Sequence, residues 1–152
     1  MSPRSGAVVA TLGCVLFLAC GTVDVGQNFQ FAEVIYDQNY FYCKVEPMLM
    51  QEQCGPGGSS DPPNGCHYNV TPFRLQQHDP VPCTGVVPKS GAIPAEAQNN
   101  YQAAEREMSP DPDRAALLNR PTQRAAHPRQ IFLVASPQAD LIRSWATQFS
   151  SQ

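Results

Sequence analysis

Hydrophobic and polar residues follow a helical period most clearly near the end of the chain. One set of apolar side chains recurs at intervals of three or four positions and would share one face of a helix. The set consists of Leu141, Ile142, Trp145, Ala146 and Phe149. Ser136 is a favourable N-cap and Pro137 suits the first helical turn. The pattern therefore predicts a helix that begins at about residue 137 and buries one face.

Apolar and aromatic residues also concentrate between residues 31 and 54. Pro47 is expected to divide this stretch, because proline is poorly tolerated inside a helix but suits its first turn. We therefore predict one short helix before Glu46 and a second helix from Pro47 to about Gln53.

Later segments predict two more helices and several loops. Residues 94–108 begin with proline and are dense in Ala, Gln and Glu, which favours an exposed helix. A short helix is expected over residues 113–119. Residues 55–65 and 78–93 are rich in Gly and Pro and predict loops. Together the segments indicate a small all-α domain of short helices with long Pro/Gly-rich loops.

The first 19 residues have the pattern of an export signal. Arg4 precedes an uncharged apolar run over residues 7–19. A helix needs about 20 residues to cross roughly 30 Å of hydrocarbon, so this run is too short to span a membrane. A short apolar run after a basic residue is typical of a cleaved signal peptide. The mature chain is then expected in an oxidising compartment.

Residues 17–21 (FLACG) resemble the lipobox of bacterial lipoproteins, although Phe17 stands where Leu is usual. The resemblance implies that residues 1–19 are a lipoprotein signal peptide and that Cys20 is the lipidated first residue. Residues 20–30 would form a tether, and residues 31–152 the domain. The protein would be anchored through its lipid in the bacterial cell envelope, facing the periplasm or the cell exterior. Ordinary secretion with cleavage nearby is the alternative.

Composition limits the remaining classes of function. The formal net charge is -3 and charged residues make up 15% of the chain, so the electrostatic footprint of a nucleic-acid-binding protein is missing. The sequence contains no nucleophile elbow, phosphate-binding glycine loop or HExxH motif. We therefore expect neither a nucleic-acid partner nor an enzyme.

Four cysteines remain in the domain once Cys14 leaves with the signal and Cys20 is lipidated. They are Cys43, Cys54, Cys66 and Cys83. Four cysteines allow three disulfide connectivities, and their spacing does not choose among them.

The adjacent pair Cys66-His67, with Cys54 upstream, contains the groups that covalent haem attachment requires. Two thiols add to the haem vinyl groups, and the neighbouring imidazole becomes the proximal iron ligand. The usual motif has two residues between the cysteines, whereas eleven lie between Cys54 and Cys66. A segment of this length, rich in Gly and Pro, can loop out at modest entropic cost.

Several short motifs resemble a family of bacterial envelope c-type cytochrome domains, the monohaem cytochrome c-like lipoproteins. They are residues 43–54 (CKVEPMLMQEQC), 65–67 (GCH) and 115–121 (AALLNRP), then His127, Phe132 and residues 141–145. The long cysteine spacing, the extra pair Cys43 and Cys83, and Pro128-Arg129 depart from the family pattern. The resemblance implies a cytochrome c-like fold and one covalently bound haem c, with Cys54 and Cys66 as thioethers and His67 as the proximal iron ligand.

A cytochrome of this family would be a membrane-anchored electron carrier or an electron-transfer subunit. Its partner would be a redox protein or a larger envelope complex. His127 stands where the family places its late histidine and is the favoured distal ligand. Met108 is the alternative, and His78 is a third candidate.

Cys43 and Cys83 flank the haem segment and are expected to form a disulfide that brackets it, as suits a small exported domain. In the alternative interpretation, Cys43–Cys83 and Cys54–Cys66 are both disulfides and His67 is incidental. The protein would then be a disulfide-braced structural or interaction lipoprotein of an envelope complex with no haem. Zinc is disfavoured, because an oxidising compartment pairs thiols.

Overall fold

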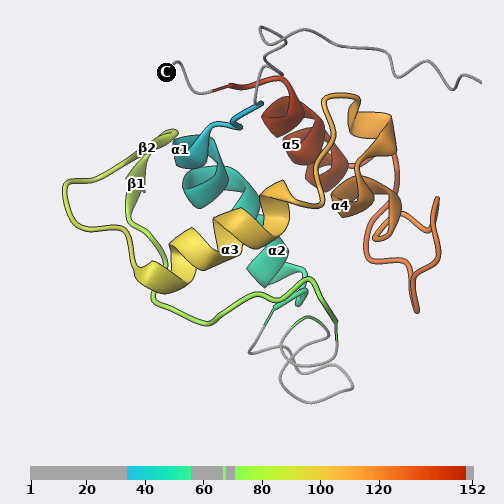
Figure 1. The fold of residues 1–152 in the computed structure, drawn as a ribbon, viewed down its shortest axis with the longest axis horizontal. Coiled ribbons are helices and arrows are strands. Elements are labelled where there is room, and N and C mark those ends of the chain that lie inside the picture. The colour runs from blue at the N-terminus through green and yellow to red at the C-terminus, as the bar shows by residue number, and fades with distance from the viewer. Residues whose placement is uncertain (1–33, 56–66, 68–70, 150–152) are drawn as a thin grey trace, which may run out of the picture. The chain divides into compact units, whose positions relative to one another are not determined.

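The computed structural model describes residues 34–55, 67 and 71–149 (Figure 1). The predicted signal peptide, the tether, Cys20 and Cys66 lie outside the described residues. The elements, in chain order, are α1 (Gln38–Tyr40), the π-helix η1 (Phe41–Val45), α2 (Glu46–Gln51), β1 (Cys83–Thr84), β2 (Val87–Pro88), α3 (Ala95–Glu105), the 3₁₀-helix η2 (Pro112–Arg114), α4 (Ala116–Asn119) and α5 (Pro137–Ala146). The predicted helical class is confirmed in its coarse form, because the elements of the described chain are mostly helices with one small two-stranded sheet. No helix in this part of the chain is long and apolar enough to cross a membrane.

The first helical stretch runs without a break from α1 through η1 to α2, so the predicted interruption at Pro47 is wrong. Asp37 caps its start, accepting a hydrogen bond from the Tyr40 amide at 2.7 Å. Proline lacks an amide proton and its ring crowds the carbonyl four residues earlier. The amide of Glu46 instead reaches back five residues, to the carbonyl of Phe41. This wider π-turn lies directly before Pro47 and lets the helical path continue past it.

A short antiparallel hairpin follows, in a region that the sequence predicted as loop. Cys83 pairs with Pro88, and Thr84 pairs with Val87. The two-residue turn between the strands begins with Gly85, whose φ of +66° suits a primed hairpin turn. Because each strand is only two residues long, periodicity gives no signal that could reveal it.

The expected disulfide between Cys43 and Cys83 is present and joins η1 to the start of β1. It closes a sequence separation of 40 residues. That loop contains both Cys54 and His67, so the bridge anchors the two ends of the segment that carries them.

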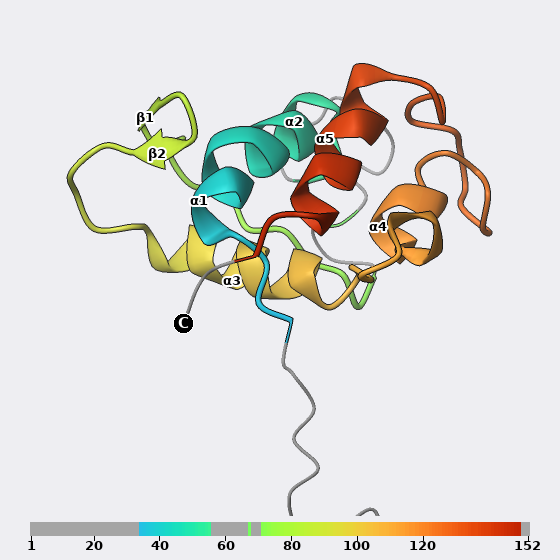
Figure 2. The ribbon, with the colours of Figure 1, turned by 90° about the horizontal axis from the view of Figure 1, so that it is seen from above.

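Helices α3 and α5 both pack against η1 (Figure 2). The prediction of an exposed helix over residues 94–108 is wrong in part, because α3 buries one face. Its buried residues are Ala97, Asn100, Tyr101 and Ala104. Helix α5 begins as predicted, with Ser136 accepting a hydrogen bond from the Ala139 amide at 3.3 Å. Short elements η2 and α4 replace the single helix that was expected over residues 113–119.

Trp145 on α5 is the centre of the core. It is fully buried, and its ring centroid lies 5.1 Å from Phe41, 5.4 Å from Tyr36 and 6.0 Å from Tyr101. Its indole nitrogen donates to the carbonyl of Asp37 at 2.9 Å. The ring therefore joins α5 to the start of the first helical stretch and to α3.

Candidate functional site

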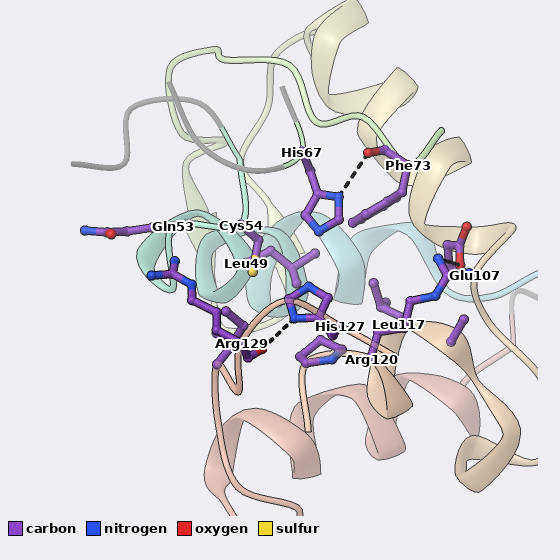
Figure 3. A pocket seen from close by; sticks show the side chains of 13 residues that line it. Leu49, Gln53, Cys54, His67, Phe73, Glu107, Leu117, Arg120, His127 and Arg129 are labelled. Carbon is purple, nitrogen blue, oxygen red and sulfur yellow. Dashed lines mark hydrogen bonds and ion pairs between the residues drawn. The ribbon is translucent and has the colours of Figure 1, made fainter. Parts of the chain in front are cut away.

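A pocket lies between the end of α2, residue His67, and the segment that runs from α4 to Ile131 (Figure 3). Its apolar lining comes from Leu49, Phe73, Ala116, Leu117, Pro121 and Ile131, and its polar lining from Gln53, Cys54, His67, Glu107, Arg120, His127 and Arg129. The empty space is about 470 Å³ when the part open to solvent is included. About 30 Å³ of it is wide enough for the centre of a water molecule, which is room for a few waters.

Cys54 reaches the pocket wall through a defined helix ending. The amide of Cys54 bonds to the carbonyl of Leu49 at 2.9 Å, and the amide of Gln53 bonds to the carbonyl of Met50 at 3.1 Å. With Gln53 at a φ of +59°, these two bonds form a Schellman motif. Only 6% of Cys54 is exposed. After it, the chain passes close to α2, because a Cβ added to Gly55 would lie 2.7 Å from the Met50 sulfur.

Both backbone polar groups of His67 are hydrogen-bonded. Its amide donates to the Cys54 carbonyl at 3.1 Å, and its carbonyl accepts from the Leu75 amide at 2.9 Å. In the ring, Nδ1 lies 2.8 Å from Thr71 Oγ1 and 3.2 Å from the Phe73 carbonyl. The Thr71 hydroxyl donates its own proton to that carbonyl, so its oxygen accepts from Nδ1. Nδ1 therefore carries the proton, and Nε2 has a lone pair.

His127 is oriented in the same way. Its Nδ1 lies 2.5 Å from the carbonyl of Arg129, which can only accept, so Nδ1 again carries the proton. No hydrogen bond among the described residues reaches Nε2 of His67 or of His127. The two rings face each other across the pocket, with centroids 6.1 Å apart and planes inclined by 24° (Figure 3).

Burial and the charges around the pocket favour a neutral His67. Burial lowers the pKa of its imidazole below the ordinary value, and the charges of His127 and Arg120 lower the pKa further. Only the hydrogen bond to the Phe73 carbonyl acts in the opposite direction. Neutral imidazole is the form that binds a metal. Arg120 in turn pairs with Glu107 at 3.1 Å on the rim of the pocket.

The structure brings together three of the residues predicted from the sequence: Cys54, His67 and His127. Cys66 lies outside the described residues. Met108 is half-buried against the core and does not line the pocket. His78 lies in a different cluster, bonded to Glu46.

Sequence reasoning missed the groups that orient the two imidazoles. They are the Thr71 hydroxyl and the carbonyls of Phe73 and Arg129. Two of these groups belong to the backbone, which has no sequence signature. Within the described residues, no cluster of three or more His, Cys, Asp or Glu side chains could hold a metal ion by itself.

Comparisons with known proteins do not assign the chain to a family. None of the protein-family models, curated proteins or solved structures compared with it gives a match. The function of the pocket is therefore argued from its own side chains.

Proposed function

We propose that the chain is a membrane-anchored c-type cytochrome with a cytochrome c-like domain. It would bind one haem covalently and act as an electron carrier, or as an electron-transfer subunit, in the bacterial cell envelope. The observation that carries this proposal is the pair His67 and His127. They come from distant parts of the sequence, face each other across one pocket, and share its wall with Cys54.

The two rings lie close together, with centroids 6.1 Å apart and planes inclined by 24°. Both rings have Nδ1 bonded to the protein, so Nε2 is the nitrogen that each could offer. A protein partner at the other nitrogen is the usual arrangement of a metal-bound histidine.

Each of the candidate residues would hold the haem in its own way. Cys54 and Cys66 would hold the haem through thioethers, while His67 and His127 would be the axial ligands. Haem would supply a one-electron iron couple. Its porphyrin nitrogens would provide the iron ligands that the protein side chains do not. Met108 is the weaker distal candidate, because it does not line the pocket. A histidine in that place gives a lower reduction potential than methionine would.

The narrowness of the pocket favours a second candidate. A macrocycle would need the lining side chains to move apart, because only about 30 Å³ is wide enough for the centres of water molecules. A disulfide-braced envelope lipoprotein without haem needs no such opening. The disulfide Cys43–Cys83 suits this candidate and the cytochrome equally.

The ligand assignment is tested by absorption spectroscopy of the chain made in a host with haem-attachment machinery. We expect the wild type to bind haem covalently and to show a low-spin spectrum. His127→Ala should keep the haem but lose the low-spin bands, and added imidazole should restore them. Met108→Leu, the matched control, should leave the spectrum unchanged. A wild type without haem would refute the proposal, and a spectrum that depends on Met108 alone would refute the role of His127.

A further inference from the structure

A buried charged pair lies outside the pocket, between α2 and the segment that follows Phe73. The side chains of Glu46 and His78 are 4% and 7% exposed. His78 Nε2 lies 2.8 Å from Glu46 Oε1, and His78 Nδ1 lies 2.7 Å from the carbonyl of Asp79. Both ring nitrogens thus face oxygen acceptors. Only the doubly protonated imidazolium can donate to both at once.

Asn100 connects this pair to the backbone. It is fully buried on α3, and all its hydrogen-bonding groups are used. Its Nδ2 donates to Glu46 Oε1 and to the carbonyl of Gln76, both at 2.8 Å. Its Oδ1 accepts from the amide of Gln76 at 2.6 Å. One side chain therefore binds both polar groups of Gln76, as a neighbouring strand would.

The residue before Gln76 leads directly to the pocket. Leu75 is 1% exposed, and its amide donates to the carbonyl of His67 at 2.9 Å. Gln76 is thus held by Asn100, and its chain neighbour Leu75 is bonded to His67.

We propose that Glu46, His78 and Asn100 are positioning residues for His67. Loss of the His78 proton loosens the hold of these three residues on the His67 ring. The link to haem rests on the proposed function, whereas the positioning of the ring does not. Deprotonation removes one of the two donors of His78 and leaves the Glu46 carboxylate without its counter-ion. A buried charge that loses its counter-ion is strongly destabilising, so the segment after Phe73 shifts.

Neighbouring titratable groups act on the pair from η1 and α3. Burial lowers the pKa of His78, but hydrogen bonds to Glu46 and Asp79 and the charges of Glu46 and Glu96 outweigh it and raise the pKa above 6.5. Burial raises the pKa of Glu46, against the hydrogen bonds from His78 and Asn100. Burial and the charge of Glu46 also raise the pKa of Tyr42. Both shifts favour a proton held by the His78–Glu46 pair.

The test is nitrogen-15 NMR of histidine-labelled full-length chain, in the reduced state where haem is bound. We expect the His67 ring signals in the wild type to shift with pH, with the same midpoint as the His78 titration and above the ordinary imidazole value. Glu46→Gln keeps the hydrogen-bonding oxygen but removes the charge, so this shared midpoint should move to lower pH. Asn100→Ala should separate the two residues, so that His67 no longer follows His78. Asn99→Ala, which loses an exposed hydrogen bond to the Gln76 side chain at 3.3 Å, should match the wild type.

The proposal fails if the His67 signals ignore the His78 titration in the wild type, or if Glu46→Gln leaves the midpoint where it was. Glu46→Gln keeps the test decisive even where Asn100→Ala does not fold. The absorption spectrum of the same samples reports haem separately. A chain without haem would refute the cytochrome and leave the positioning of His67 to be decided by the NMR comparison.

Discussion

Asn100→Ala removes three hydrogen bonds from a site with no exposure to solvent. Two of them join the side chain to the backbone of Gln76, and the third joins it to the carboxylate of Glu46. A neutral hydrogen bond contributes about 1 kcal/mol, and one to a charged group about 1.5–3 kcal/mol. The free energy of unfolding should therefore fall by about 4 kcal/mol. Asn99→Ala, one residue away, loses one exposed bond and should cost no more than about 0.5 kcal/mol.

Urea unfolding followed by fluorescence measures both variants in the same assay. Trp145 is the single tryptophan of the chain and is fully buried, so its emission reports loss of the core. The midpoint should fall sharply for Asn100→Ala with little change in the slope of the transition, because a similar surface is exposed on unfolding. A difference of less than about 1 kcal/mol between the two variants would refute the view that Asn100 carries the structure around Gln76.

Three further predictions concern the fold. Replacing Cys43 and Cys83 by serine should lower the free energy of unfolding by about 4 kcal/mol, the chain-entropy value for a loop of this length, as measured in urea. His78→Gln should be less stable than the wild type at pH 6, and the difference should shrink as the pH rises. The pKa of His78 is raised in the folded state, so the stabilisation that His78 gives is complete below the ordinary pKa of 6.5. This stabilisation is lost as the pH rises through the higher pKa of the folded state. A stability difference that grows with pH would contradict the assignment. Ser136→Ala should cost about 1 kcal/mol in thermal unfolding, because the cap of α5 is lost, and an unchanged midpoint would show that the cap contributes nothing.

The helices with a local signal could be predicted from the sequence, and the elements that depend on distant contacts could not. Helix α5 follows from the periodic apolar residues and from Ser136 and Pro137. The path through Pro47 was missed, because a π-turn is a change of hydrogen-bond register that no single residue type marks. The buried face of α3 was also missed, since much of it is small or polar, with Asn100 at its centre.

The candidate site was only partly accessible to sequence reasoning. Cys54, His67 and His127 were selected by chemistry and by resemblance, and all three line one pocket. The Glu46–His78–Asn100 cluster could not be found in this way. Its members come from three distant segments, and each residue taken alone is an ordinary polar side chain.

The most direct test of the cytochrome proposal is a pyridine haemochrome spectrum beside the intact mass of the mature chain, purified from a host with haem-attachment machinery. A cytochrome should give a c-type spectrum and the added mass of one haem, with Cys54 and Cys66 as the attachment points and the disulfide Cys43–Cys83 intact. A chain without haem, and with a mass lowered by the hydrogens of two disulfides, would contradict it and leave the braced envelope lipoprotein as the explanation.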